Sequence, residues 1–367
     1  MKVLVSVFNN LYTDQRVEKV CRTLSENGFA IELIGNSWGG LPEMQRNYPF
    51  SRLALKSKIL RYAYVEFQWK LYRELLRKAD KNTILLSNDL DTLLPNYLVS
   101  RKLQIPLVYD SHEIFTEMPS VNGRFTQNIW RSLETFIVPK LKYMMTASES
   151  YADWFHKTYE IERPVVVQNF PIKIENPQNY SEVNSIKIII YQGVINPSRG
   201  LGMMIPAMRK IDGAELWIAG DGPQKLELVE LTKTLGLDHK VKFIGKLIPE
   251  KLRTITQKAD VGLSIEENNG LSYYLSMPNK VSDYIQARIP VVVSAFPEMR
   301  KVIDHFGAGE KISDHTELVD KVKIVLENGK KSYENVLNHA AAHLCWEQEE
   351  PKIIALFHNI KSQLPKS

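Results

Sequence analysis

The sequence predicts an α/β fold with two domains, each built on a parallel sheet. The chain has 367 residues, 44% of them hydrophobic, and a soluble chain of this length favours two domains over one. Short apolar runs alternate with stretches of helical spacing, and the alternation restarts after residue 185. Because strands joined by a helix pair in parallel with a right-handed crossover, each half is expected to form its own parallel sheet.

The first half opens with strand, helix and strand. Residues 2–7 and 29–34 are apolar runs, and residues 15–27 have helical spacing that ends at Gly28, a typical helix C-cap. The first loop lacks the G-x-G-x-x-G sequence of dinucleotide-binding proteins. Ser148 is expected to be the N-cap of a helix over residues 151–156. Further strands are expected at residues 83–86, 106–109, 144–146 and 165–167.

Residues 51–80 predict a long helix that is both basic and aromatic. An ordinary amphipathic helix with a solvated basic face explains this composition, and a helix lying on an anionic membrane surface is the alternative. No run approaches the roughly 20 apolar residues of a membrane span. The N-terminal run reads as a core strand, not a signal peptide. We therefore expect a cytoplasmic protein, peripheral on the inner face of the membrane if this helix binds lipid.

Charge and cysteine content exclude several other classes. The net charge of +5 suits an anionic ligand, but it is spread out and no recognition motif is present, so no nucleic-acid partner is expected. Cys21 and Cys345 are far apart and lack metal-ligand spacing. They are expected to be buried thiols in a reducing compartment, and no metal site is predicted.

The second half places glycines near the ends of its strands. Residues 173–185 are polar and without periodicity, and are expected to link the two halves and to act as a hinge. Glycine near a strand end lets a ligand approach the backbone closely, although turns also need it. The strands are expected at residues 186–191, 215–219, 241–243, 261–265 and 290–293, and the glycines are Gly193, Gly220 with Gly222, Gly245 and Gly270.

Residues 266–290 contain the strongest candidate site. Glu266 follows an expected strand, and Lys280 and Asp283 lie in the first turns of an expected helix over residues 278–287. In an open parallel sheet, ligands bind beyond the carboxyl ends of the strands. The helix N-terminus adds free N–H groups that favour an anion. This stretch therefore predicts an anion-binding pocket, and a nucleotide-sugar pocket is the hypothesis to test.

Several segments resemble those of the GT-B glycosyltransferases of the "glycosyl transferases group 1" type (glycosyltransferase family 4). The resemblance covers nearly the whole chain, and its C-terminal matches are specific in combination. The matching segments are Asp14-Gln15-Arg16-Val17, Asp110-Ser111-His112-Glu113, Ala147-Ser148-Glu149, Ser198-Arg199-Gly200, Ala219-Gly220-Asp221-Gly222-Pro223, and Pro278-Asn279-Lys280-Val281-Ser282-Asp283-Tyr284 followed by Pro290-Val291-Val292.

The resemblance implies a GT-B fold, with two Rossmann-like domains whose parallel sheets face each other across a cleft. Residues 1–172 would be the acceptor domain, residues 186–342 the donor domain, and residues 343–367 a C-terminal helix that packs back on the N-terminal domain. The implied activity is retaining, metal-independent transfer of a sugar from a nucleotide diphosphate-sugar to a glycan or lipid-linked acceptor, in surface polysaccharide synthesis. No cofactor is implied beyond the nucleotide-sugar co-substrate.

The resemblance also assigns residues, with three departures from the family pattern. The loop after Glu266 is longer than usual, Asp283 stands in place of the second glutamate, and Val194 stands where an arginine is usual. Arg199 and Lys280 would therefore bind the diphosphate, because a planar guanidinium and a point charge suit it. Asp283 would bind the ribose. The catalytic residues would be His112 and Glu266 (or else Glu267), which would contact the transferred sugar. Further donor contacts are implied for Asn279, Gly193, Gly220 and Gly245, and acceptor contacts for Asp14 and Asp110.

The sequence leaves two other kinds of function open. One is a different GT-B enzyme, such as a nucleotide-sugar epimerase or a phosphorylase. The other is a non-catalytic protein that binds a nucleotide-sugar without transferring it. Transfer or hydrolysis of a donor by the purified chain separates these alternatives.

Overall fold

The computed structural model describes residues 1–12, 14–175, 177 and 186–364. The chain divides into two compact units: unit 1 is Met1–Asn169 with Glu349–Ser367, and unit 2 is Phe170–Gln348. Each unit contains one sheet. The expected linker and hinge at residues 173–185 lies mostly outside the described residues, so its role stays a prediction.

The sheet of unit 1 has seven parallel strands in the order β3-β2-β1-β4-β5-β6-β7. The strand order changes direction between β1 and β4, as in Rossmann-type sheets, and ligands bind at such a switch point. The inner strands are buried on both faces, which explains their continuous apolar runs. The strands are β1 (Lys2–Ser6), β2 (Ala30–Asn36), β3 (Phe50–Leu53), β4 (Thr83–Asn88), β5 (Leu107–Ser111), β6 (Tyr143–Thr146) and β7 (Val165–Val166).

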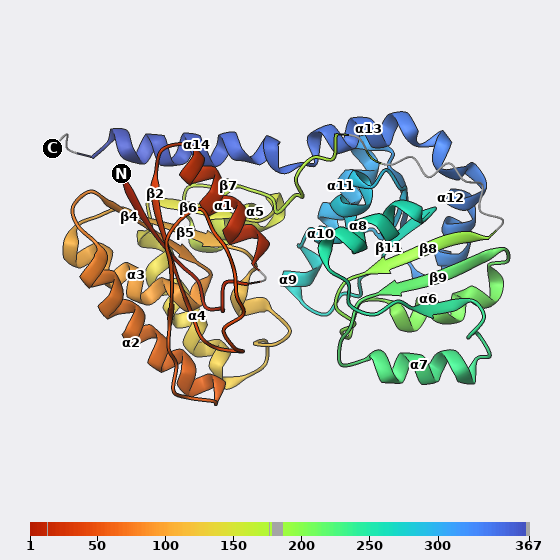
Figure 1. Cartoon of the computed structure of the whole chain (residues 1–367), viewed down its shortest axis with the longest axis horizontal. Coiled ribbons are helices and arrows are strands. Elements are labelled where there is room, and N and C mark those ends of the chain that lie inside the picture. The colour runs from red at the N-terminus through yellow and green to blue at the C-terminus, as the bar shows by residue number, and fades with distance from the viewer. Residues whose placement is uncertain (13, 176, 178–185, 365–367) are drawn as a thin grey trace. The chain divides into compact units, whose positions relative to one another are not determined.

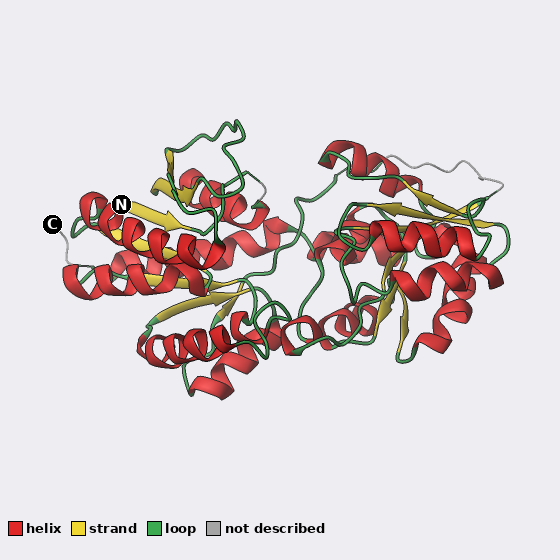
Figure 2. Ribbon diagram, turned by 90° about the horizontal axis from the view of Figure 1, so that it is seen from below, coloured by secondary structure: helices red, strands yellow, loops and turns green. Residues whose placement is uncertain are grey.

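Helices cover the sheet of unit 1 on both sides, and Figure 2 shows its strands between helices. The C-terminal helix α14 belongs mainly to this unit and runs along one side of it, whereas α2, α3 and α4 lie on the other (Figure 1). The ring of Phe357 packs edge-on against Phe29, and Thr23 donates a hydrogen bond to Glu350. The helices are α1 (Gln15–Glu26), α2 (Leu60–Lys78), α3 (Leu90–Leu103), α4 (Phe125–Ile137), α5 (Glu149–Tyr159) and α14 (Trp346–Ser362).

The predicted helix over residues 51–80 was wrong at its beginning. The segment Phe50–Leu53 is strand β3, and α2 begins only at Leu60. β3 pairs with β2, with Arg52 opposite Gly35. The Arg52 guanidinium donates to the carbonyl oxygens of Asn10 and Pro42. Arg52 therefore stabilises loops of its own unit. The helical spacing of this segment is overridden by its pairing with the sheet.

Unit 2 repeats the same topology with six parallel strands in the order β10-β9-β8-β11-β12-β13. Its switch point lies between β8 and β11. The strands are β8 (Lys187–Gln192), β9 (Ala214–Ala219), β10 (Val241–Phe243), β11 (Val261–Ser264), β12 (Val291–Ser294) and β13 (Gly309–Ile312), and the helices are α6 (Leu201–Ala207), α7 (Lys225–Thr234), α8 (Pro249–Lys258), α9 (Leu271–Tyr274), α10 (Asn279–Gln286), α11 (Pro297–Phe306), α12 (Leu318–Ser332) and α13 (Glu334–His343).

The two sheets confirm the predicted α/β fold with two parallel-sheet domains. The sequence did not lead us to assign α4, α11, β13 or α12, and it led us to treat α9 as part of a loop. Short helices such as α9 have too few residues for a periodic pattern to be visible. Within the described part of the chain, no helix is both long and apolar enough to cross a membrane.

Candidate functional site

Three charged side chains of unit 2 meet at its switch point. Glu266 follows β11, Arg199 lies in the loop between β8 and α6, and Lys280 is in the first turn of α10. The Glu266 carboxylate accepts from Arg199 Nη1 at 2.7 Å and from Lys280 Nζ at 2.8 Å. The structure thus brings together the two cations and one of the two glutamates that the sequence reading singled out.

This cluster is buried and carries a net positive charge. Glu266 is 4% exposed and Lys280 is 9% exposed. Burial by itself would raise the pKa of Glu266, but Lys280 and Arg199 outweigh it and lower that pKa. Burial lowers the pKa of Lys280, and the ion pair with Glu266 offsets this only in part. Two cations around one carboxylate leave a surplus positive charge that suits an anionic ligand.

Two tyrosines that the sequence reading missed line the same cluster. The Lys280 ammonium lies 4.4 Å from the ring centroid of Tyr191, and the Arg199 guanidinium lies 4.7 Å from that of Tyr273. Such cation–π contacts fix the long side chains and help to hold the positive charge in a partly dry site. Tyr191 is recognisable as the residue before the Gln192-Gly193 strand end, whereas Tyr273 is placed by the unforeseen helix α9.

Asp283 lies on α10, one turn beyond Lys280, and is half-buried. Its Oδ2 accepts from the Gln192 side chain at 2.9 Å, and the Gln192 amide oxygen accepts from the Thr256 hydroxyl at 2.7 Å. The Gln192 backbone N–H donates to the Tyr284 hydroxyl. Gln192 therefore orients Asp283 at the end of β8, a contribution the sequence reading did not foresee.

The two candidate glutamates differ in their surroundings. Glu267 is exposed, and its backbone N–H donates to the Ser198 carbonyl, which ties this loop to the β8–α6 loop. Only Glu266 joins the two cations. Asn279 is exposed at the start of α10.

The three predicted donor glycines also differ. Gly193 directly follows β8, is exposed, and has a φ of +135° that other residues rarely adopt. A Cβ at Gly193 would lie 3.8 Å from Lys280 Cε, so this glycine borders the charged cluster. A Cβ at Gly220 would come within 1.8 Å of the Gly193 carbonyl oxygen, so Gly220 is required for loop packing. A Cβ at Gly245 would meet no atom within 4 Å.

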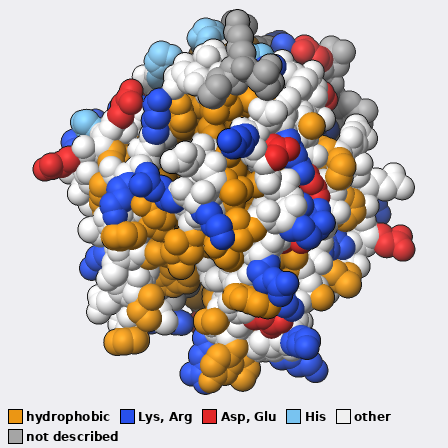
Figure 3. Space-filling model, turned by 90° about the vertical axis from the view of Figure 1, so that its left-hand side faces the viewer, with side chains coloured by type: hydrophobic (Ala, Val, Ile, Leu, Met, Phe, Trp, Pro, Cys, Tyr) orange, Lys and Arg blue, Asp and Glu red, His pale blue; other side chains and the backbone are white. Residues whose placement is uncertain are grey.

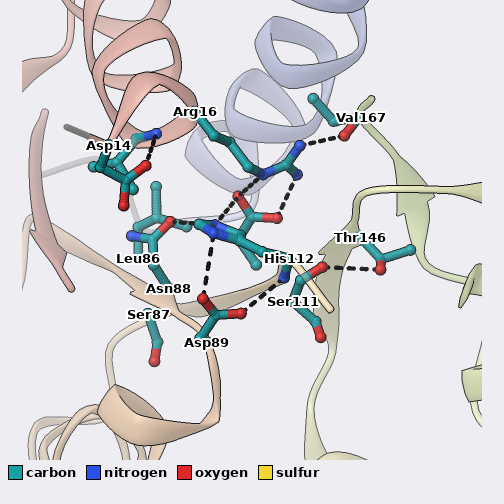
Figure 4. Close-up of polar contacts among 12 residues, drawn as sticks. Asp14, Arg16, Leu86, Ser87, Asn88, Asp89, Ser111, His112, Thr146 and Val167 are labelled. Carbon is teal, nitrogen blue, oxygen red and sulfur yellow. Dashed lines mark hydrogen bonds and ion pairs between the residues drawn. The ribbon is translucent and has the colours of Figure 1, made fainter. Parts of the chain in front are cut away.

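The carboxyl ends of β4 and β5 in unit 1 carry a second charged cluster, shown in Figure 4. Arg16 of α1 donates through Nε and Nη2 to the two carboxylate oxygens of Asp110, at 3.0 and 2.6 Å. Its remaining nitrogen donates to the carbonyl of Val167. Asp110 is fully buried and Arg16 is 3% exposed. This is a desolvated bidentate pair that joins α1 to the centre of the sheet.

His112 lies next to this pair and is 17% exposed. Its Nε2 is 3.1 Å from Asn88 Oδ1 and 3.4 Å from Asp110 Oδ2. Burial alone would lower the pKa of His112, but the carboxylates of Asp89 and Asp110 outweigh it and raise the pKa to about 9. The imidazole is therefore a cation at neutral pH.

The two predicted acceptor residues are both engaged within unit 1. Asp14 is the N-cap of α1, accepts from the Val17 N–H, and also accepts from the Asn9 side chain. Asp110 is buried, and its oxygens face Arg16 and His112. Because Asp110 is buried and paired in this way, its geometry disfavours a contact with an acceptor. Among the described residues, no group of three or more His, Cys, Asp or Glu side chains has the arrangement to hold a metal ion.

Two Rossmann-like units with parallel sheets are the architecture of the GT-B class, and solved structures share this fold. Sucrose-phosphate synthase from Thermosynechococcus elongatus matches with a TM-score of 0.80, 12% identity and 99% coverage of both chains. HepE of Anabaena in complex with UDP matches with a TM-score of 0.74 and 15% identity, over 98% of this chain and 100% of that one.

Family models match both halves of the chain. The model described as "Glycosyltransferase Family 4" matches residues 14–170, and "Glycosyl transferases group 1" matches residues 173–343. The chain therefore belongs to the GT-B glycosyltransferases of the group 1, family 4 type.

Curated relatives agree with this membership at lower coverage. An uncharacterized glycosyltransferase of Methanocaldococcus jannaschii is 32% identical over 32% of this chain and 30% of its own length. The lipopolysaccharide core biosynthesis glycosyltransferase LpsD of Rhizobium meliloti is 33% identical, over 16% of this chain and 17% of its own length. The chain thus spans less than a third of either relative. Chitobiosyldiphosphodolichol beta-mannosyltransferase of Candida glabrata is 20% identical over 89% of this chain and 83% of its own length.

Proposed function

We propose that the protein transfers a sugar from a nucleotide diphosphate-sugar to a glycan or lipid-linked acceptor, with retention at the anomeric carbon. One observation carries this proposal: Arg199 and Lys280 converge on Glu266 at the switch point of unit 2. A diphosphate is the anion that a guanidinium and an ammonium at this position suit best.

In the reaction, the bond between the anomeric carbon and the diphosphate oxygen breaks, and its electron pair stays on the diphosphate. The acceptor hydroxyl oxygen forms the new bond to the anomeric carbon, and its proton passes to the departing diphosphate oxygen. Arg199 and Lys280 stabilise the charge that develops on the leaving diphosphate, which is the largest contribution we assign. This assignment underlies the proposal of a metal-independent reaction.

The other residues position the donor sugar and the nucleotide. Glu266 leaves its ion pairs when the diphosphate arrives and accepts from hydroxyls of the transferred sugar. Asp283, held by Gln192, binds the ribose hydroxyls, and Asn279, Glu267 and Gly193 border the donor. His112 of unit 1 supplies a cationic donor to the same sugar. Asp110 is reassigned from acceptor contact to positioning of Arg16 and His112, whereas Asp14 stays a candidate acceptor contact.

A thermal-shift screen against UDP, GDP, ADP and dTDP and their sugars tests the proposal. A ligand that binds only the folded chain raises its Tm, by mass action, and a concentration of 100 times Kd stabilises by about 2.7 kcal/mol. We expect one base to give a clear shift, and the matching nucleotide-sugar to be turned over with a suitable acceptor. Binding without any turnover would instead favour a non-catalytic protein, and no shift with any nucleotide would refute the donor site.

We also propose that unit 1 carries the acceptor and docks on an anionic membrane surface on the cytoplasmic side, in surface polysaccharide synthesis. LpsD and the dolichol-linked mannosyltransferase, by their names, act in lipopolysaccharide and lipid-linked glycan synthesis. Helix α2 exposes Tyr62, Val65 and Trp69 at 54 to 69%. Figure 3 faces the end of the molecule at which α2 and α3 lie in Figure 1, and hydrophobic groups are interspersed there with lysine and arginine.

Neutralising the exposed basic residues just before and at the start of α2 is expected to abolish this docking. The triple variant Lys56→Gln/Lys58→Gln/Arg61→Gln spares Arg52, which is engaged within the fold. At about 1 kcal/mol per cation near an anionic surface, its partition into phosphatidylglycerol-containing liposomes should fall about 100-fold. Sedimentation with these liposomes measures the change.

The control variant removes the same charge from exposed positions of unit 2: Lys210→Gln/Lys233→Gln/Lys251→Gln. Its partition should stay within about twofold of the unmodified chain. Equal losses in the two variants would show a general charge effect. Absence of binding by the unmodified chain would end the membrane proposal without affecting the donor site.

A further inference from the structure

Asp89 is a residue without an assigned role that contacts His112 twice. It lies between β4 and α3, in the N-cap position of α3, but its side chain does not cap that helix. Instead Oδ1 accepts from the backbone N–H of His112 at 2.9 Å, and Oδ2 lies 3.3 Å from His112 Nδ1 (Figure 4). The backbone N–H of Asp89 donates to the carbonyl oxygen of Asp110 at 2.9 Å, which completes a link between the two strand ends.

The backbone of Asp89 is held in an unfavourable conformation. Its φ of 58° and ψ of 169° lie at the edge of a region occupied almost only by glycine. Glycine at this position would remove the strain, and an N-cap role does not account for aspartate, because the side chain makes no cap bond. The chain therefore has a strained aspartate where glycine would be unstrained, and both carboxylate oxygens of this aspartate face His112.

The charges around His112 single out Asp89 as its counter-ion. The other carboxylate in contact with the ring, Asp110, is engaged by the bidentate pair with Arg16. The remaining acidic groups nearby are Asp14 at the start of α1, whose charge acts on Asp89, and Asp91 of the first turn of α3, on which the charge of Asp89 acts. Burial raises the pKa of Asp91 well above its usual value. Arg16 is the nearby cation, and its charge opposes protonation of His112.

The hydrogen-bond geometry agrees with a charged ring. Nδ1 faces Asp89, and Nε2 faces the Asn88 amide oxygen and Asp110. Acceptors at both nitrogens suit the doubly protonated imidazolium, whose two nitrogens both donate. The partners of Nε2 are an uncharged amide oxygen at 3.1 Å and, at 3.4 Å, a carboxylate that Arg16 already engages. Nε2 is therefore the nitrogen whose partners a sugar hydroxyl can replace.

We propose that Asp89 is a positioning residue, which clamps the backbone and Nδ1 of His112 so that a charged ring presents Nε2 to the transferred sugar. The part concerning the sugar rests on the proposed function. The clamp itself is a property of unit 1 and is testable without any substrate. Asp89 touches no reacting atom and acts only through His112.

Histidine-selective NMR on the full-length chain tests the clamp. The chain has eight histidines, and His112→Gln identifies the His112 signal by its loss. We expect the unmodified His112 to remain protonated at pH 7.5 and to titrate near pH 9. In Asp89→Asn the titration should fall by at least about one pH unit, a tenfold change in the protonation constant. The control variant Asp153→Asn, which removes an exposed carboxylate of α5 that pairs with Arg163, should leave it unchanged.

Asp89→Gly separates positioning from a structural role. Because glycine relieves the backbone strain, its Tm should equal or exceed that of the unmodified chain, while His112 loses its high pKa. With an active donor and acceptor pair, kcat should fall at least tenfold in Asp89→Gly, and the alkaline limb of its pH profile should move to lower pH. An unchanged His112 titration in Asp89→Asn would overturn the proposal. A changed titration in a chain that turns over no donor would uphold the clamp and refute the transferase function instead.

Discussion

Replacing Lys280 with methionine is expected to weaken binding of the nucleoside diphosphate by about 10- to 100-fold. A hydrogen bond to a charged group contributes about 1.5–3 kcal/mol, and each 1.4 kcal/mol is tenfold in Kd. Methionine retains much of the length of the lysine stem beside Tyr191, so the fold should persist. Transfer should fall further, by about 100- to 1,000-fold, because the charge of the leaving diphosphate grows in the transition state.

Isothermal titration with whichever of UDP, GDP, ADP and dTDP raises the Tm most measures the change. Lys301→Met is the matched control, because Lys301 lies on α11 of the same unit, with its side chain 54% exposed in an ion pair with Glu298. This control should bind normally. Lys280→Met with unchanged affinity would show that the diphosphate lies elsewhere.

Replacing Glu266 with glutamine is expected to have the opposite effect on binding of the nucleoside diphosphate. The Glu266 carboxylate pairs with both Arg199 and Lys280, so the diphosphate must displace it. A neutral amide should therefore bind the nucleoside diphosphate several-fold more tightly while it slows transfer. Equal weakening by Glu266→Gln and Lys280→Met would indicate that Glu266 only supports the fold of the loop.

Asp110→Ala is expected to destabilise unit 1 by about 3–5 kcal/mol, the usual cost of leaving one partner of a buried ion pair alone. Arg16 is 3% exposed and would keep its charge without a carboxylate. The double variant Arg16→Met/Asp110→Leu should recover much of this loss, because it removes both charges. Urea unfolding of the full-length chain, followed by hydrogen exchange of β4 and β5 amides, reports on this unit separately.

The control is Asp153→Ala, which breaks the contact between Asp153 and Arg163, whose side chains are 51% and 41% exposed. An exposed pair contributes about 0–1 kcal/mol, so this loss should be small. If Asp110→Ala were no more damaging than Asp153→Ala, the buried pair would not stabilise the unit. If the double variant were as unstable as the single one, packing around Arg16 and not its charge would be responsible.

Local patterns in the sequence were sufficient for most of the fold. Apolar runs and helical spacing predicted strands in both halves, and the restart after residue 185 predicted two parallel sheets, as observed. Patterns failed where an element is short or its pairing is distant. Leu271–Tyr274 is only one turn of helix. Phe50–Leu53 is a strand because β2 offers it backbone partners, although its own sequence suits a helix.

The candidate site was predictable in its residue types but not in its pairings. Lys280 and Asp283 were recognisable because they lie in the first turns of a helix that follows a strand end, where ligands bind. Arg199 was assigned through the resemblance to the family. The choice between Glu266 and Glu267 required the structure, because alternate residues point in opposite directions at a strand end. Only Glu266 turns toward the two cations.

By itself, the sequence indicated the family through the resemblance of its motifs. It determined the two parallel sheets and the charged residues available at their edges, because these depend on local spacing and composition. The tertiary structure alone decided which charges neutralise one another. Arg16 and Asp110 are 94 positions apart, and Glu266 and Arg199 are 67 apart. Asp89 became recognisable as the clamp of His112 only when adjacent parallel strands brought the ends of β4 and β5 together. Ion pairing depends on distance in space and on burial, neither of which can be read along the chain.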